Sequence, residues 1–207
     1  MTAEWITAIA SLITALGLVG IVYQIRLAQK QLKADHERSR REKAIELLTL
    51  WDSNLSITSA TARKFVESLG FEEAKSLYAQ ESFEISPASY NLFLGAISPE
   101  SAEKRPEIVP DENIIITPIE AQEIRWAATK YLNQLETTFT AVRNNIADRE
   151  IVYEQFHYLI SERDGSFVMD HYRKASGGIE TYPSIEQFVQ DNKGKLKKVP
   201  AGKEKTA

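Results

Sequence analysis

Few side chains in this 207-residue chain have the types and spacing that catalysis or metal binding requires. The chain contains no Cys and three His, at His36, His157 and His171. Glu154 and His157 are three residues apart, so on a helix they are neighbours and resemble half of a di-iron carboxylate site. A complete site needs a second pair of this kind, and the remaining acids near His171 have unsuitable spacing. The sequence therefore predicts an ordinary surface contact at this pair and no metal site.

Asp170, His171 and Arg173 form a second polar group close together in the sequence. Two interpretations remain open, a nuclease-like or phosphate-handling site and the solvated end of a helix. Glycines occur in neither a G-x-x-x-x-G-K-[ST] nor a G-x-G-x-x-G frame, and no Ser lies in a G-x-S-x-G turn. We therefore expect a protein that is not an enzyme and that binds no cofactor.

Four polar residues are predicted to fix a helical hairpin rather than to react. Within it, Glu136, Arg143 and Glu150 are spaced to pair across the two helices, where buried charges fix register more than they add stability. Asp148 is a candidate N-cap for the second helix. The four residues are Glu136, Arg143, Asp148 and Glu150.

The chain contains a long uncharged segment near its N-terminus, and the location of this segment determines where the rest of the chain lies. Residues 5–25 include 21 positions without a charge, enough for a helix of roughly 32 Å against a hydrocarbon core of about 30 Å. A buried helix of a soluble domain is the first alternative, but such helices seldom lack charge on every face. A cleaved signal peptide is the second, and it fits poorly because no Lys or Arg precedes the apolar run. We predict a transmembrane anchor over residues 1–25.

Basic residues follow this span closely, and cytoplasmic flanks are rich in Lys and Arg. This asymmetry predicts an N-terminus outside and residues 26–207 in the cytoplasm. Residues 26–43 are expected to form a helical stalk whose cations contact membrane lipid headgroups. The predicted membrane-surface residues are Arg26, Lys30, Lys33, Arg38, Arg40, Arg41 and Lys43.

Small or hydroxylated residues recur at Thr7, Ser11 and Thr14, and the same alternating spacing of four and three continues beyond them. We call this pattern the seam, and it comprises Thr7, Ser11, Thr14, Leu18, Ile21, Ile25, Ala28 and Leu32. Small residues allow membrane helices to approach closely, and a sustained pattern of this period is typical of parallel helix pairs. The seam predicts self-association, centred on Thr7, Ser11 and Thr14.

Residues 44–191 have helical periodicity and are long enough for one domain. The strongest helix is predicted from Pro118 to about Asn145, opened by Thr117 and Glu120 as a capping box. The Pro-rich stretch 98–117 is predicted as a loop, mobile or functional, with Ile114, Ile115 and Ile116 as a short extended segment. The predicted fold class is all-α: one N-terminal transmembrane helix continuing into a cytoplasmic multi-helix bundle.

Charge is distributed unevenly along the chain, although the total is only −4. Residues 44–191 hold 12 Lys and Arg against 24 Asp and Glu, whereas residues 192–207 hold six Lys against one Glu. The latter segment is predicted to be a disordered Lys-rich tail. It has no interleaved aromatic residues, so contact with headgroups is favoured over nucleic acid, which is an unlikely partner.

The stretches 131–136 and 142–153, together with the opening Trp5-Ile6-Thr7-Ala8-Ile9-Ala10, resemble a bacterial family of unknown function. Asn133, Glu136, Asp148 and Glu150 match the family pattern, and the resemblance implies that they complete, with Arg143, the set that fixes the hairpin. Members of that family have one N-terminal membrane helix, a basic juxtamembrane helix and a helical cytoplasmic domain. The resemblance implies a bacterial origin and inner-membrane anchoring, and it suggests a place among mobile-element and phage-defence genes. It implies no active site.

Two functions follow as hypotheses. The first is a non-enzymatic, single-pass inner-membrane protein whose cytoplasmic helical domain is a scaffold or sensor that binds itself or an unknown protein partner. The second is a homo-oligomeric membrane effector that permeabilises the bilayer under the control of its cytoplasmic domain.

Overall fold

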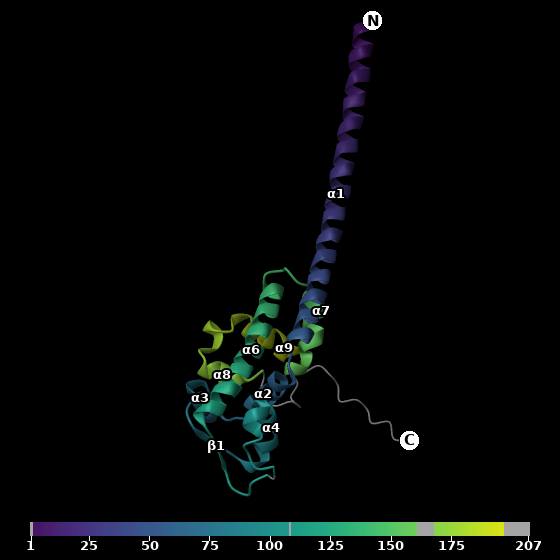
Figure 1. Cartoon of the computed structure of the whole chain (residues 1–207). Helices are drawn as coiled ribbons and strands as arrows, with labels where there is room; N and C mark the ends of the chain where they lie inside the picture. Colours follow the sequence, from purple (N-terminus) through teal and green to yellow (C-terminus); the bar gives the residue numbers. More distant parts are fainter. Residues whose placement is uncertain (1, 108, 161–167, 197–207) are drawn as a thin grey trace, which may run out of the picture.

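The computed structural model describes residues 2–107, 109–160 and 168–196, with side chains in the first turns described at positions 5, 8, 12 and 14. This part of the chain is mostly helical and contains one small two-stranded sheet. The all-α class predicted from the sequence is therefore confirmed. A single long helix, α1, projects from a group of shorter helices that we call the body, residues 44–196 (Figure 1).

The long helix α1 runs from Thr2 to Asn54 without a break. No Pro occurs in it and no Gly follows Gly20, so nothing in the sequence interrupts the helix beyond that point. Side-chain pairs one turn apart support its stalk, with Arg38 Nε 2.8 Å from Glu42 and Lys43 Nζ 2.8 Å from Glu46. Within the described residues, no helix combines the length and the apolarity needed to cross a membrane.

Seven further helices of six residues or more build the described part of the body. They are α2 (Ile57–Glu67), α3 (Phe71–Ala79), α4 (Tyr90–Ala96), α6 (Pro118–Arg143), α7 (Arg149–Phe156), α8 (Asp170–Ala175) and α9 (Pro183–Leu196). The shorter pieces are η1 (Pro87–Ser89), α5 (Pro99–Ala102), η2 (His157–Ile160) and η4 (Gly178–Glu180). The other elements are arranged around α6 (Figure 1).

The start of α6 is held by the capping box that the sequence predicts. The Thr117 side chain accepts from the Glu120 amide, and a Glu120 carboxylate oxygen accepts from the Thr117 amide at 2.8 Å. Arg105 donates to the same carboxylate, through Nε at 2.7 Å, and to the carbonyl of Ile115 at 2.9 Å. Burial acts to raise the pKa of Glu120, but the hydrogen bonds from Arg105 and Thr117 outweigh it and leave the pKa below its ordinary value.

The predicted loop 98–117 is attached to the body at several points. Strand β2 (Ile114–Ile116) pairs antiparallel with β1 (Phe83–Ile85), so the extended segment is confirmed, but it has a partner strand that the sequence did not indicate. At the other end, the Glu123 carboxylate accepts from the Ser98 amide at 2.9 Å and from the Ser101 hydroxyl at 2.7 Å. These contacts give the Pro-rich segment a defined path over α6.

Trp51 joins the base of α1, residues 44–54, to the rest of the body. Its ring is 8% exposed and makes edge contacts with Tyr131 of α6 and Phe156 of α7, each at a centroid distance of 5.0 Å. The carbonyl of Arg40 accepts from the Asp148 amide at 3.0 Å in the turn between α6 and α7. The stalk and the body are therefore linked through both packing and a backbone hydrogen bond.

The C-terminal helix extends further than the sequence predicted. α9 continues to Leu196, beyond the boundary of the Lys-rich tail predicted at residue 192. Phe188 and Val189 are buried in the core, and the buried Asn192 donates to the Phe188 carbonyl at 2.8 Å, which holds the helix together past that boundary. The rest of the predicted tail, residues 197–207, lies outside the described residues.

Replacing Trp51 with Ala should lower the free energy of unfolding by about 3–5 kcal/mol, because it leaves a cavity between α1, α6 and α7. Trp126→Ala is the matched control, since Trp126 is 74% exposed and its loss should change stability by about 0.5 kcal/mol or less. Urea unfolding of the full chain in detergent, followed by circular dichroism, measures both. Equal effects of the two substitutions would contradict this view of Trp51.

Candidate functional site: the groove between α1 and α6

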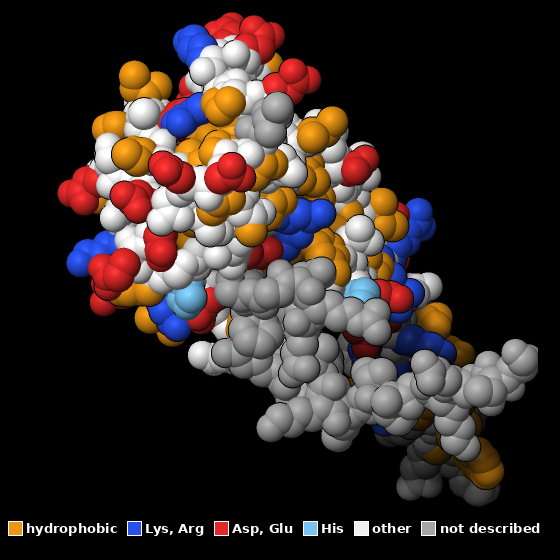
Figure 2. All heavy atoms as spheres, turned by 90° about the horizontal axis from the view of Figure 1, so that it is seen from below, with side chains coloured by type: hydrophobic (Ala, Val, Ile, Leu, Met, Phe, Trp, Pro, Cys, Tyr) orange, Lys and Arg blue, Asp and Glu red, His pale blue; other side chains and the backbone are white. Residues whose placement is uncertain are grey.

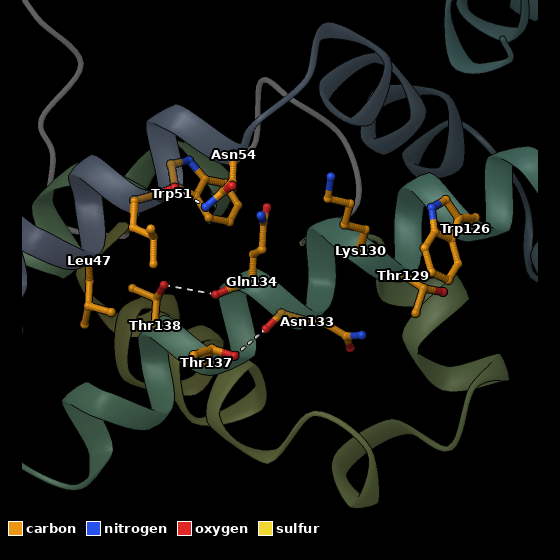
Figure 3. Close-up of a pocket in the computed structure, with 11 residues that line it drawn as sticks. Leu47, Trp51, Asn54, Trp126, Thr129, Lys130, Asn133, Gln134, Thr137 and Thr138 are labelled. Atoms are coloured by element: carbon orange, nitrogen blue, oxygen red, sulfur yellow. Dashed lines mark hydrogen bonds between the residues drawn. The ribbon is translucent and has the colours of Figure 1, made fainter.

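A groove of about 310 Å³ separates the base of α1 from the outer side of α6 (Figure 3). We call this hollow the groove. One wall is formed by residues one turn apart on α1, and the other by residues along three turns of α6. The lining consists of Leu47, Leu50, Trp51 and Asn54 on α1, and Trp126, Thr129, Lys130, Asn133, Gln134, Thr137 and Thr138 on α6.

The threonines of the α6 wall use their hydroxyl protons within the chain. Thr137 donates to the Asn133 carbonyl at 2.8 Å and Thr138 donates to the Gln134 carbonyl at 3.0 Å (Figure 3). On the opposite wall, the Asn54 side-chain amide donates to the Leu50 carbonyl at 2.8 Å. Because these donors are already engaged, this part of the groove offers mainly apolar contact.

Three polar side chains of the α6 wall make no such hydrogen bond. Lys130, Asn133 and Gln134 make no side-chain hydrogen bond or ion pair with any described residue. They occupy positions i, i+3 and i+4 of one helix face, so they form a short polar row beside Leu50 and Trp51. A helix laid in this groove would meet apolar contacts from α1 and hydrogen-bonding groups from α6.

Trp126 marks one end of the groove and is the most exposed Trp of the body. Its ring also borders two further hollows, of about 470 and 320 Å³, toward Gln80 and toward the start of α2. Exposed Trp residues flanked by hollows are frequent anchors of protein interfaces. The sequence held a signal for this residue, because position 126 falls outside the apolar stripe of α6 that includes Ile124, Ala128 and Tyr131.

The base of α1 is positioned beside α6 by the turn that follows α6. Asp148 caps α7, accepting from the amides of Glu150 and Ile151 at 3.0 and 3.2 Å, as the sequence predicts. Its second carboxylate oxygen lies 3.8 Å from Arg41 of the stalk. Asp148 therefore fixes α7 and the stalk together, and with them one wall of the groove.

The other residues of the predicted hairpin set have different surroundings. Glu136 does not pair with Arg143 or Glu150, which are both exposed and form no ion pair among the described residues. Its carboxylate instead accepts from the amides of Ser184 and Ile185 at 2.9 and 3.0 Å. These amides belong to the first turn of α9 and have no partner within that helix, so Glu136 caps α9 from α6.

The candidate catalytic groups are occupied in structural contacts. His157 Nδ1 lies 2.8 Å from the carbonyl of Glu154, one turn back, rather than from its carboxylate. His171 Nδ1 lies 2.9 Å from the carbonyl of Leu69, which joins α8 to the end of α2. In the described ranges, no group of three or more potential ligands could hold a metal ion.

Arg173 is fully buried, and it organises the third candidate cluster. Its guanidinium donates to the Val168 carbonyl at 2.9 Å, to Glu186 at 2.5 Å and to Asp170 at 3.3 Å. Burial lowers the pKa of Arg173, against the effect of the carboxylates of Glu186, Asp170 and Glu136, which raise it. The cluster thus joins α8 to α9 around a buried charge.

The seam and the stalk lie apart from the groove on α1. The side chains of Thr7 and Ser11 lie outside the described set, whereas Thr14, Leu18, Ile21, Ile25, Ala28 and Leu32 are exposed. Among the predicted membrane-surface cations, Arg38 and Lys43 pair with acids of α1, and Arg41 lies near Asp148. Some of the stalk cations therefore already lie beside acidic side chains of the same chain.

The fold and the groove together define a helical protein in which a long N-terminal helix carries a body with an apolar hollow at its base. The chain belongs to the family described as Domain of unknown function (DUF4760), which matches residues 7–189. This membership agrees with the resemblance to a family of unknown function. The comparisons found no match among curated proteins and none among solved structures.

Glu136→Ala should lower the free energy of unfolding by about 1–3 kcal/mol and speed hydrogen exchange at Ser184 and Ile185, because two amides lose a charged acceptor. Glu136→Gln keeps one acceptor oxygen and should lose less. Asn133→Ala, on an exposed position one turn earlier, should change stability by about 0.5 kcal/mol or less. Unchanged exchange at α9 in Glu136→Ala would disprove the capping role.

Proposed function

We propose that this protein is a single-pass membrane protein in which residues 5–25 of α1 lie in the inner membrane and the helical body is a cytoplasmic interaction domain. The supporting observation is the exposure of α1 along its first half. Large apolar side chains there are at least half exposed, among them Leu12, Leu16, Leu18, Val19, Ile21, Val22, Tyr23 and Ile25.

These side chains cover more than half of the circumference of α1, because consecutive positions such as Leu18 and Val19, or Ile21 and Val22, are all exposed. A helix that packed on a soluble body would hide one stripe of such residues. The body lies at the other end of α1 and covers none of them (Figure 1). Lipid is the environment that stabilises an apolar surface on every face of one helix.

The full sequence supports the same proposal, since the 21 uncharged residues include Ile6, Ile9 and Ile13, whose side chains lie outside the described set. The first cations follow at Arg26 and Lys30, which favours an N-terminus outside. The bacterial family resemblance adds phage-defence or mobile-element genes as the context of this role.

The continuous helix refines which basic residues would contact lipid. If α1 follows the membrane normal, Lys33 is about 12 Å beyond Ile25, whereas Arg38 to Lys43 are roughly 20–27 Å beyond it. Screening limits headgroup attraction to about 8–10 Å. Arg26 and Lys30 are therefore the headgroup contacts in this proposal, Lys33 lies just beyond that range, and the later cations stabilise the stalk.

The cytoplasmic role that fits the body is binding, as a scaffold or sensor. The groove offers apolar contact along about three turns of α6 and a row of hydrogen-bonding groups, which suits recognition of a protein segment. Acidic side chains are spread over the face of the body that points away from the N-terminal end of α1 (Figure 2). This agrees with the 24 Asp and Glu against 12 Lys and Arg in residues 44–191. An acidic body is repelled by anionic lipid, so it would stay at the end of the stalk.

Replacing Leu16 and Val19 together with Asp should release the full-length protein from membranes, since each charge near the centre of a span opposes insertion by about 2.5–3.5 kcal/mol. The readout is the fraction that remains with membranes after carbonate extraction. Ile45→Asp with Ile119→Asp is the matched control, because these residues are similarly exposed but lie outside residues 5–25. Release of the control as well, or retention of the test variant, would refute the anchor.

A second candidate function, a membrane-permeabilising effector, is favoured by the seam. Leu18, Ile21, Ile25, Ala28 and Leu32 continue its spacing and are all exposed on the single chain. Several copies joined along this line would bring their helices together in the bilayer.

Ser11→Leu with Thr14→Leu should abolish dye release from liposomes that contain the wild-type protein, because larger side chains separate the helices at the seam. Ala8→Leu with Ala15→Leu, about a quarter turn away, is the control and should leave release unchanged. Absence of release by the wild type would leave the anchored scaffold or sensor as the function.

A further inference from the structure

We propose that the groove holds the base of α1 from a second copy of this chain, so that α1 and α6 of two copies form a four-helix bundle about a two-fold axis. This inference rests on the membrane anchoring and self-association proposed above. It assigns the groove an occupant, and it places the contact between copies at the cytoplasmic end of α1 as well as in the bilayer.

The first argument is the position of the groove around α1. Leu50 follows Leu32 by 18 residues, which is about five full turns of an α-helix. Leu50 therefore lies on the same side of α1 as the last residue of the seam, and Leu47 and Asn54 lie one turn away on either side of it. α1 has no break between these positions, so a second helix that follows the seam is directed into the groove.

The second argument is that the groove and the base of α1 lie at the same distance from the bilayer. Two copies inserted in one membrane with the same orientation hold their α1 helices parallel, so that their Leu50 side chains lie at the same distance from the bilayer. Each copy then presents the base of its α1 at the level of the other's groove. Tethering both chains in one plane raises their effective concentration at this site without any further contact.

The third argument is charge. The body is acidic, so most of its surface would repel a second body. The groove is lined by no Asp or Glu, and its single cation is Lys130 at the far end from the stalk. The residues that line the groove therefore add no carboxylate to the contact between copies, and Glu46, one turn before Leu50 on α1, is paired with Lys43 at 2.8 Å.

The fourth argument is the surface chemistry of the two walls. Leu50 is 56% exposed, and in the bundle it would be buried against the partner copy's α1 and α6. Asn133 and Gln134, which have no side-chain partner among the described residues, lie on the facing helix. Apolar residues with a few amides between them are a common way to fix the register of helix bundles.

The absence of Cys from the chain allows a direct test by cross-linking in lipid nanodiscs. Leu50→Cys in the full chain should form a symmetric intermolecular disulfide on mild oxidation. Ile45→Cys is the matched control, since Ile45 is 58% exposed but lies more than a third of a turn around α1 from Leu50. We expect at least tenfold more cross-linked dimer for Leu50→Cys, and equal yields for the two variants would overturn the proposal.

A mixed experiment tests the α6 wall separately. One tagged copy carries Asn133→Cys and a differently tagged copy carries Leu50→Cys, so that only a contact between copies gives a product with both tags. Gln122→Cys replaces Asn133→Cys in the control, because Gln122 is exposed on α6 outside the groove lining. A doubly tagged product from Asn133→Cys alone is expected, and its absence would place the second copy elsewhere.

A third variant, Ile25→Cys, tests the seam at the last residue of the proposed span. It distinguishes failure of this inference from failure of the proposed self-association. Cross-linking at Ile25 without cross-linking at Leu50 would refute occupation of the groove while keeping association in the membrane. Cross-linking at neither position would contradict both. Cross-linking at both positions, and not at Ile45, is the expected result.

Discussion

The packing of Trp51 between Tyr131 and Phe156 is the interaction on which the arrangement of this protein depends. Residues 16–36 of α1 are all exposed, so the direction of the helix is set at its base. Two edge-on aromatic contacts at 5.0 Å and the buried Ala44 allow α1 to approach the body closely. Without this fixed base, the stalk would point in no particular direction, and the groove would have only one wall.

Charged groups complete the body by attaching one element to the start or end of another. Glu136 caps α9 from α6, Arg105 joins the loop 98–117 to the capping box of α6, and Arg173 joins α8 to α9. In each contact a charged side chain meets backbone groups or an opposite charge that would otherwise be buried without a partner. These groups had the residue types of a catalytic or ligand site, and the structure uses them to connect short helices.

The predictions that were correct rested on residues close together in the sequence. Thr117 and Asp148 cap the helices that follow them because an N-cap depends on residues only two or three positions away. The apolar stripe of α6 was likewise predictable, since its members share one helix face. The partner of the strand at residues 114–116, the true partner of Glu136 and the groove were not predictable. Each depends on residues that are 29 or more positions apart and come together only after packing. For Trp126, the sequence showed only that a large apolar residue lies outside that stripe.

The uninterrupted course of α1 also limits how the stalk can change in length during evolution. Each residue added to or removed from a helix rotates everything after it by about 100° and shifts it by about 1.5 Å. A single insertion between Leu32 and Leu50 would turn the groove away from the side on which the seam lies. Changes of seven, eleven or eighteen residues nearly restore the original phase. Relatives with this architecture should therefore have stalks that differ in whole numbers of helical repeats, while the residues themselves vary freely.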